Sequence, residues 1–383
     1  MGQMGCRMCT QEETETQLKF SRIYTKNGVK VQKLPAEIKE DYNNFIALFE
    51  NNLKFIGNYI SQQEFNSYIP EKVQNYMIEH PLIIKEEYNV CTETYELKPV
   101  EFKNGNIYQG NWNDDLKMEG LGKYYLKDQN VLAEGIWANG DLQYARVFLE
   151  NGDIYEGEMK NSTFNGKGKL ISTNGDIYEG EFVDGKTNGN GKLVFGDKVV
   201  YEGQFEKGEF RGNGHMRWPN GYDYEGNFDG PKLCGFGVLT HPCGDKYEGN
   251  FENSLFHGNG KYTYENGDIY EGEFQYGVKK GKGIYNALHK YEYNGDWDND
   301  LPYGVGQLTN WNQKALLKST WRNGKIIEEP TFEKGAKGDF KAIDLNIVPE
   351  EMKLDIKELT HLETFDANSS QYRIGSLPSF LED

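Results

Sequence analysis

Residues 178–182 read Tyr-Glu-Gly-Glu-Phe, and residues 189–191 read Gly-Asn-Gly. This pair of short motifs decides the fold, because it returns every 23 residues without any drift in spacing. A fixed period of this kind indicates a repeat array, in which each unit buries its apolar face only against its neighbours. The tyrosines that open the seven regular copies are Tyr155, Tyr178, Tyr201, Tyr224, Tyr247, Tyr270 and Tyr293.

The residue pattern within one copy predicts a β-hairpin. Every second residue of a strand faces the same side, so Tyr178, Gly180 and Phe182 share one face and the two glutamates between them share the other. In the second motif, glycines alternate with lysines in several copies. Pairing the two motifs as antiparallel strands lets an aromatic ring cover glycine backbone and sets Glu against Lys on the opposite face.

Successive hairpins are joined by segments such as Asn174-Gly175-Asp176 and Asn266-Gly267-Asp268. These residue types tolerate the positive φ angles that tight turns require. Because a lone hairpin is marginal in water, the units are expected to stack edge to edge. The sequence therefore predicts a mainly β fold, an elongated single-layer array of antiparallel β-hairpins over residues 100–325.

The order Tyr-Glu-Gly-Glu-Phe, Gly-Lys-Gly, Asn-Gly-Asp resembles the MORN repeat. The resemblance covers residues 100–325, with a first copy at Tyr108, a degenerate second copy at Ala133 and a closing aromatic at Trp321. It implies a scaffold that docks proteins, in settings such as ciliary axonemes, radial spoke heads and the cortical cytoskeleton. Other members of the family imply an adaptor at membrane junctions.

Composition limits the function further. The chain has 383 residues, a formal net charge of −18 and a pI near 4.9, which argues against a nucleic-acid partner, since phosphate binding needs clustered Lys and Arg. It contains no long apolar run and no apolar signal-peptide core. Its five cysteines are scattered, so we expect a reducing, intracellular location without a disulfide framework.

The N-terminal tail, residues 1–17, suggests a lipid anchor. Gly2 follows the initiator Met, and Cys6 and Cys9 are close enough for a second acyl chain. Cys6 stands where the acylation motif prefers Ser or Thr, and the glutamates that follow have the wrong charge for an anionic membrane. A frayed tail is the alternative, and a zinc site at these two cysteines is a weaker one. Membrane contact is expected only if the tail is acylated.

Residues 18–95 are expected to form a small helical domain. Apolar residues from Ile38 to Ile60 recur at steps of three or four, typical of one helix of about 25 residues. The Ser61-x-x-Glu64 motif predicts a capped second helix, and Pro70 predicts a third. This domain either covers the first edge of the sheet or binds a partner.

Residues 326–383 are expected to form an acidic tail with one short helix near residues 349–356. The tail either caps the last hairpin or is ordered by a partner. The sequence favours neither alternative.

The sequence contains no constellation typical of an active site. Its Gly-x-Gly motifs occupy sheet positions rather than phosphate-binding turns, so we expect no enzyme and no cofactor. Cys234, His241 and Cys243 are residue types that bind zinc, but their positions favour the surface and no metal is expected. Lys279, Lys280 and Lys282 form the only basic cluster of the array, and the acidity of the chain disfavours binding of lipid headgroups.

The aromatic ladder is the first candidate partner-binding face, because exposed aromatic patches mark interaction sites. The alternative is that most rings pack on one another and on the glycines. The residues of this face are Tyr155, Tyr178, Phe182, Tyr201, Phe205, Tyr224, Phe228, Tyr247, Phe251, Tyr270, Phe274, Tyr293 and Trp297.

A second candidate is a loop column that differs from copy to copy and could therefore carry specificity. Its residues are Asn165, Asn188, Arg211, Cys234, His257, Lys280 and Tyr303. The sequence thus predicts a non-enzymatic scaffold for proteins of a large ciliary or cytoskeletal assembly, with an acylated membrane adaptor as the alternative. Self-association of two arrays is left open.

Overall fold

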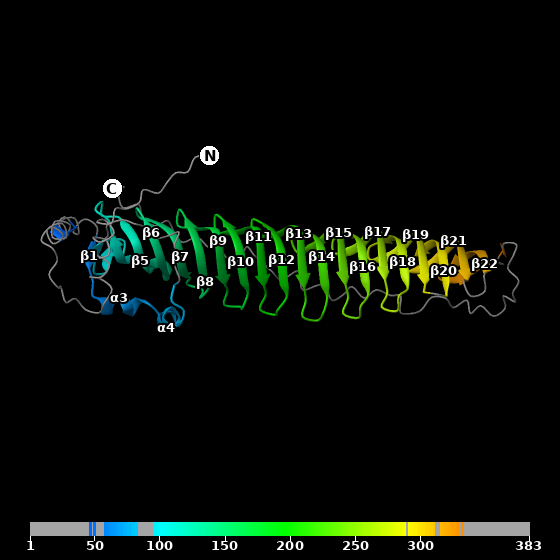
Figure 1. Ribbon diagram of the computed structural model, residues 1–383, viewed down its shortest axis with the longest axis horizontal. Coiled ribbons are helices and arrows are strands. Elements are labelled where there is room, and N and C mark those ends of the chain that lie inside the picture. The colour runs from blue at the N-terminus through cyan, green and yellow to red at the C-terminus, as the bar shows by residue number, and fades with distance from the viewer. Residues whose placement is uncertain are drawn as a thin grey trace, which may run out of the picture. The chain divides into compact units, whose positions relative to one another are not determined.

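The computed structural model describes residues 46–47, 49–50, 57–82, 95–288, 290–310, 315–328 and 331–332 (Figure 1). The chain forms two compact units that divide between Thr173 and Asn174. The proposed lipid anchor at Gly2, Cys6 and Cys9, most of the expected first helix, and the expected helix near residues 349–356 lie outside the described residues.

The first unit is an antiparallel sheet with two short helices beside it. Strand β1 pairs with β3, β3 and β2 both pair with β4, and β4 to β9 follow one another as neighbours. The elements are β1 (Gly57–Tyr59), α3 (Gln62–Tyr68), α4 (Glu71–Glu79), β2 (Tyr95–Glu96), β3 (Val100–Phe102), β4 (Ile107–Trp112), β5 (Met118–Leu126), the 3₁₀ turn η2 (Lys127–Gln129), β6 (Val131–Ala138), β7 (Asp141–Phe148), β8 (Ile154–Lys160) and β9 (Thr163–Ile171).

The second unit repeats one hairpin. Each strand from β10 to β22 pairs antiparallel with the next. The strands are β10 (Ile177–Val183), β11 (Lys186–Val194), β12 (Val200–Glu206), β13 (Glu209–Arg217), β14 (Asp223–Asp229), β15 (Lys232–Thr240), β16 (Lys246–Glu252), β17 (Leu255–Thr263), β18 (Ile269–Gln275), β19 (Val278–Ala287), β20 (Tyr291–Asp298), β21 (Leu301–Asn310), β22 (Ala315–Arg322), β23 (Lys325–Ile326) and β24 (Thr331–Phe332). The predicted array of antiparallel hairpins is confirmed.

The two glycines of each Gly-x-Gly motif serve different purposes, which alternation alone did not predict. In the β10–β11 hairpin, Gly191 lies opposite Gly180, but the register then shifts so that Glu181 faces Asn188. This β-bulge contains Gly189, whose φ of 60° lies in the left-handed region that a residue with a Cβ rarely adopts. One glycine of each motif thus forms the bulge, and the other lies in the regular ladder.

The ladder glycines lie beneath the tyrosine of their own hairpin. A Cβ on Gly214 would be 2.5 Å from Cε2 of Tyr201, and a Cβ on Gly203 would be 2.5 Å from the hydroxyl oxygen of the same ring. The Tyr201 hydroxyl donates a hydrogen bond of 2.8 Å to the carbonyl of Gln204, which is next to the bulge. The ring therefore fills the space that two side chains would need, and its polar end is satisfied as well.

The rings also contact one another from repeat to repeat within the second unit. Tyr201 makes edge-to-face contacts with Phe205 of its own strand, at 5.2 Å between ring centroids, and with Phe228 of the next repeat, at 5.0 Å. The pattern continues to the last repeat, where Tyr293 meets Trp321 at 5.3 Å. Each such pair adds about 0.5–1.5 kcal/mol beyond the area that it buries, so the rings link successive repeats.

The two strands of a repeat are joined by tight turns of two residues. Asn253 and Ser254 both have positive φ, 49° and 64°, as a type I′ turn requires. In the β14–β15 hairpin the two turn residues are Gly230 and Pro231, between the paired Asp229 and Lys232. Because proline cannot take a positive φ, Gly230 (φ 57°) supplies it, as in a type II′ turn.

The turns between repeats form at the predicted Asn-Gly-Asp segments, and each turn is also bonded to the next. Gly267 has φ 85°, and Asn266 accepts a hydrogen bond of 2.9 Å from the backbone of Asp268. The Asp268 carboxylate then accepts hydrogen bonds from the backbone N–H of Leu288 (2.9 Å) and from the Tyr285 hydroxyl (2.6 Å). These bonds fix the spacing of successive turns.

The helical segment differs from its prediction at one point. The helix expected to reach Ile60 is replaced at Gly57–Tyr59 by strand β1, which pairs with β3. Gly57 suits this strand, because a Cβ there would collide with the backbone of Glu101. The predicted N-cap of α3 is confirmed by a 3.1 Å hydrogen bond from the Glu64 backbone to Ser61, and α4 follows Pro70 as expected.

The helices pack against the face of the sheet that is turned away from the tyrosine rings. Phe65 and Ile69 join a buried cluster with Tyr125, Leu132 and Phe148 from β5, β6 and β7. The prediction that this segment covers a sheet edge holds for β1 only, because α3 and α4 lie over a face. The reason is that apolar residues replace the usual polar ones on that face in the first repeats.

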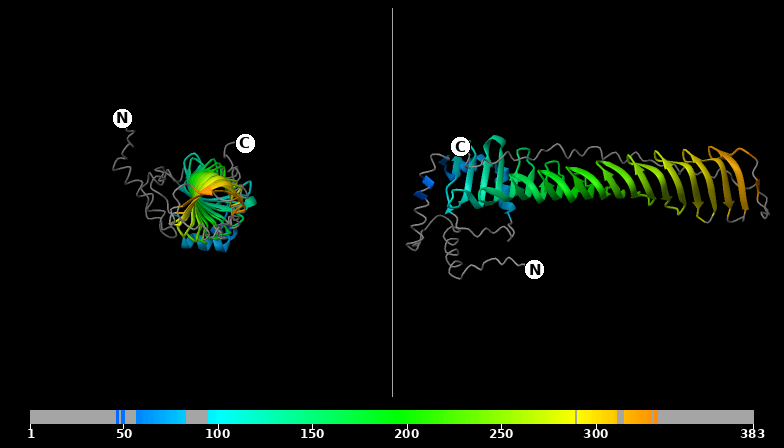
Figure 2. Two further views of the ribbon diagram at one scale, coloured as in Figure 1. Left: turned by 90° about the vertical axis from the view of Figure 1, so that its right-hand side faces the viewer. Right: turned by 90° about the horizontal axis from the view of Figure 1, so that it is seen from above.

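The second unit continues beyond the predicted end of the array. Strands β23 and β24 both pair with β22, with Trp321 opposite Ile326 and Leu317 opposite Phe332. The beginning of the expected tail therefore adds two short strands to the sheet. Within this unit, successive strands are rotated in a constant sense (Figure 2), and this twist lets one face of the sheet close on its own side chains.

A side chain on a ladder glycine should destabilise the second unit. We expect Gly214→Val to lower the free energy of unfolding by about 1–3 kcal/mol or more, because the new side chain overlaps the Tyr201 ring. Amide hydrogen exchange in β12 and β13 should accelerate. The control is Asn213→Val on the same strand, whose side chain is exposed. Equal thermal unfolding of the two variants would contradict the placement of the ring.

Candidate interaction surface

The aromatic ladder is not an open face, which corrects the first candidate surface. Each of the thirteen predicted rings is at most 4% exposed. The rings lie on ladder glycines and on one another, so they leave no surface for a partner. Desolvation by this burial raises the pKa of the ring hydroxyls, for example that of Tyr201. The residues concerned are Tyr155, Tyr178, Phe182, Tyr201, Phe205, Tyr224, Phe228, Tyr247, Phe251, Tyr270, Phe274, Tyr293 and Trp297.

The variable column is not in loops, which corrects the second prediction. Because the hairpin turns have only two residues, each member of the column already lies in a strand, directly before the bulge glycine. All members are at least partly exposed on the face opposite the rings, called here the outer face. The members are Asn165 (β9), Asn188 (β11), Arg211 (β13), Cys234 (β15), His257 (β17), Lys280 (β19) and Tyr303 (β21).

Most of the outer face carries cross-strand pairs of opposite charge, as the sequence predicted. Lys192 lies opposite Glu202, and their charged atoms are 2.8 Å apart. Arg217 approaches the same carboxylate at 2.8 Å. Hydrogen bonding and charge from these two cations lower the pKa of Glu202. The pairs are solvated, so each contributes at most about 1 kcal/mol to stability, and the face remains polar.

Strand β15 is an exception on this face. Cys234, Phe236 and Val238 alternate along it with their side chains outward, and Phe236 is 60% exposed. Val238 lies opposite Glu225 on β14 and opposite Glu248 on β16. The corresponding position of the next repeat is Lys261, opposite Glu248 and Glu271. Val238 thus takes the place that Lys192 and Lys261 occupy between two carboxylates on β11 and β17, as Ile284 does opposite Glu271 on β19.

Cys234, His241 and Cys243 do not form a zinc site in the described residues. Cys234 and Cys243 are free thiols, and burial lowers the pKa of His241. No group of three or more His, Cys, Asp or Glu side chains that could hold a metal ion occurs in the part of the chain that the structure describes.

The basic cluster is divided between the two faces of β19. Lys280 and Lys282 point outward and approach Asp298 and Asp296, whereas Lys279 is fully buried on the ring side. This arrangement leaves no joint basic patch for a lipid headgroup. Among the described helices, none has the length and apolar character to cross a membrane.

Lys279 is a buried cation among aromatic rings, which sequence reasoning missed. Its Nζ is 2.5 Å from the hydroxyl of Tyr264 and lies over the rings of Tyr270 (5.3 Å) and Trp297 (5.6 Å). Desolvation lowers its pKa to about 8, against a smaller opposing effect of Asp300. The sequence does contain a sign of this burial, because the same position of other repeats holds a phenylalanine, at Phe164, Phe210 and Phe256.

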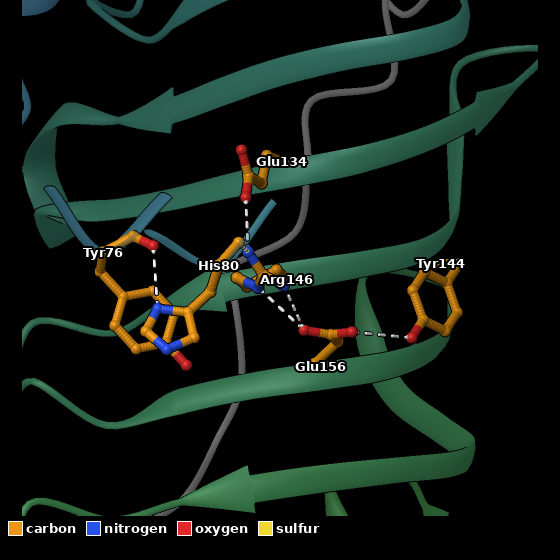
Figure 3. A network of polar contacts seen from close by, with 6 residues as sticks. All are labelled: Tyr76, His80, Glu134, Tyr144, Arg146 and Glu156. Atoms are coloured by element: carbon orange, nitrogen blue, oxygen red, sulfur yellow. Dashed lines mark hydrogen bonds and ion pairs between the residues drawn. The ribbon is translucent and has the colours of Figure 1, made fainter. Parts of the chain in front are cut away.

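In the first unit the outer face already binds helix α4, through a polar network around Arg146 (Figure 3). The Arg146 guanidinium donates to Glu156 at 2.7 and 2.8 Å, to Glu134 at 3.3 Å, and to the carbonyl of His80 after the helix. It also lies over the Tyr76 ring. Glu134 and Glu156 both lie opposite Arg146 in the sheet, so a cation between two carboxylates helps to hold a helix on this face.

Comparison with known families agrees with these features. The family model of the MORN repeat matches residues 108–131, 155–177, 178–199, 201–221, 247–269 and 270–286. The chain is a MORN-repeat protein. The hairpins opened by Tyr224 and Tyr293 lie outside the matched residues, yet they have the same register shift, with its bulge glycine, and the same ring over glycine. The MORN repeat is typically a non-enzymatic module for protein interaction.

Solved structures give only distant likenesses to this MORN-repeat protein. The TCP10 domain of Danio rerio CPAP, solved with a peptide of Danio rerio STIL, has a TM-score of 0.31 and 14% identity over 60% of this chain and 99% of that one. The TCP10c domain of Drosophila melanogaster Sas-4 has a TM-score of 0.26 and 11% identity over 41% and 93%. Scores this low do not establish a shared fold. No curated protein matches the chain.

Replacing the buried lysine should stabilise the second unit at neutral pH. We expect Lys279→Met to raise the free energy of unfolding by up to about 3 kcal/mol at pH 7, because the folded state holds a charge that burial disfavours. Between about pH 8 and 10.5 the folded wild type has lost this proton while the unfolded chain still holds it. As pH rises through this range, the free energy of unfolding of the wild type therefore increases relative to that of the variant.

The measurement is chemical denaturation of both proteins from pH 7 to pH 10, with Lys280→Met as the exposed control. The free energies of unfolding of wild type and variant are subtracted at each pH, so that the pH-dependent contribution of the tyrosines, which both proteins share, cancels. A Lys279→Met protein that is less stable than wild type across this whole range would contradict a destabilising buried charge.

Proposed function

We propose that this MORN-repeat protein is a non-enzymatic scaffold that docks proteins on the outer face of its hairpins in a ciliary, axonemal or cytoskeletal assembly. One observation carries the proposal. The ring side is nearly constant from repeat to repeat and is buried, whereas the exposed variable column differs at every second-unit hairpin from Asn188 to Tyr303. Stability is thus assigned to one face and variation to the other.

The geometry of the hairpins supports docking at a regular pitch. Neighbouring strands lie about 4.8 Å apart and each repeat contributes two strands, so equivalent outer residues recur roughly every 10 Å within a unit. The bonds between turns, such as Asp268 to Leu288, limit changes in this spacing. Such a surface suits a protein that holds several partners at set distances.

The first unit provides an internal example of docking on this face. Helix α4 and His80 directly after it are held there by Phe148, Leu132 and the Arg146 network. The same combination of apolar contact and charge pairing is available to foreign segments elsewhere on the outer face. Protein partners therefore fit this surface better than nucleic acid, which the net charge of −18 would repel.

Variants of the variable column test the scaffold. We expect Arg211→Asn with Lys280→Asn, which copy Asn188, to change the free energy of unfolding by less than about 0.5 kcal/mol, because both side chains are exposed. In native extracts the tagged variant should lose at least one protein that cross-links to the wild type. The control is Asn188→Ala. An unchanged set of cross-linked proteins would contradict docking by this column.

The membrane adaptor stays the second candidate, and it rests on Gly2, Cys6 and Cys9 alone. Intact-mass measurement of the native chain in the same preparation separates the two. Acyl additions would favour the adaptor, whereas an unmodified N-terminus together with a place in the cytoskeletal fraction would favour the scaffold.

A further inference from the structure

We infer that β15 carries a specific docking site for a basic amphipathic helix of a partner protein, and this inference rests on the proposed scaffold function. The site, called here the β15 site, consists of Cys234, Phe236 and Val238 on β15, with Glu225 on β14 and Glu248 on β16. Phe236 takes an apolar side chain of the helix, and the two carboxylates take a Lys or Arg.

The exposed aromatic ring has no structural role in the sheet. Position 236 lies between the bulge glycine and the ladder glycine, where four of the other second-unit repeats place Asn190, Asn213, Asn259 and Lys282, and the last places Val305. A polar residue therefore satisfies the fold at this point. Phe236 is 60% exposed, and on β16 it lies opposite Asn250. Large exposed aromatics of this kind are strong candidates for binding hot spots.

The charges around Val238 indicate that the partner group bound there is positively charged. On β11 and β17, Lys192 and Lys261 stand between two glutamates, and on β13 His215 stands between Glu202 and Glu225. On β15, Val238 leaves Glu225 and Glu248 without a cation between them. Glu248 has Lys246 at 3.0 Å on its own strand, and Glu225 is exposed and has no ion pair among the described residues. A partner cation placed beside Val238 would restore the pattern of the neighbouring hairpins.

The fold determines how a partner can approach. Strand β15 is paired on both sides, with β14 and β16, so a partner cannot add a strand here and must lie on the face. Helix α4 shows this mode in the first unit, where Arg146 stands between Glu134 and Glu156 and apolar contacts lie beside it. At the β15 site the acidic pair and the apolar residues are present, and only the cation and the helix are missing.

Other occupants fit the β15 site less well. A second copy of this chain would bring another strongly acidic surface, since the net charge is −18. An anionic membrane would be repelled by Glu225 and Glu248 for the same reason. A basic amphipathic helix of another protein offers apolar side chains to Phe236 and a cation to Glu225 and Glu248.

The probe is a short fluorescent helix made of Leu, Lys and Ala, with Leu along one face and Lys at its margins, titrated with the full chain. The same helix with Glu for Lys serves as the charge control. Two variants test the site: Phe236→Asn, which copies Asn190, and Val238→Lys, which copies Lys192. Because both restore residues that neighbouring repeats carry, we expect both to fold, and thermal unfolding checks this. Asn190→Ala is the matched control on β11.

We expect the Lys helix to bind wild type and the Asn190→Ala control equally, and each site variant about tenfold or more weakly. Binding should weaken with added salt, and the Glu helix should not bind. Equal binding by the wild type and both site variants would overturn the inference. The inference would also be overturned if the wild type self-associated in sedimentation velocity, or bound phosphatidylserine vesicles, and Phe236→Asn abolished that association or binding. The scaffold proposal is tested separately through Arg211 and Lys280, and it survives a negative result at Phe236.

Discussion

The contact between a tyrosine ring and two glycines is the interaction on which each regular hairpin depends. In the β12–β13 hairpin the Tyr201 ring occupies the space above Gly203 and Gly214, and its hydroxyl donates to the carbonyl of Gln204 beside the bulge. No residue with a Cβ fits at either glycine without moving the ring. The 23-residue period of the chain is the distance from one such contact to the next.

The division of labour between the two faces follows from this contact. The rings are buried on glycine and on neighbouring rings. The aromatic face, which the sequence suggests as a binding surface, therefore stabilises the sheet instead. Even the exception at Lys279 stays inside, where Tyr264, Tyr270 and Trp297 surround the cation. The recognition proposed here belongs to the outer face, on which Arg146 holds α4 within the first unit. Phe236 is the most exposed aromatic ring that a strand presents on that face.

The fold could be predicted from sequence because its signals are local and repeated. Alternation in Tyr-Glu-Gly-Glu-Phe identifies a strand, and Asn-Gly-Asp identifies a turn. The burial of the rings could not be predicted in the same way, since it depends on the twist of the sheet and on contacts between repeats, such as Tyr201 with Phe228. Alternation also hides a bulge, so Gly189 and Gly191 seem equivalent although their backbones differ. Strand β1 was missed because Ile56 and Ile60, on either side of it in the sequence, also fit a helical period.

Proton chemical shifts of the glycines test the central contact most directly. In a glycine-labelled sample, the Hα protons of ladder glycines such as Gly214 should be shifted upfield by the ring above them. Those of bulge glycines such as Gly212 should not, because no ring covers them. Replacing Tyr201 by Leu should remove the upfield shift at Gly203 and Gly214 alone. Equal, unshifted resonances for both classes of glycine would contradict the contact from which this account of the fold starts.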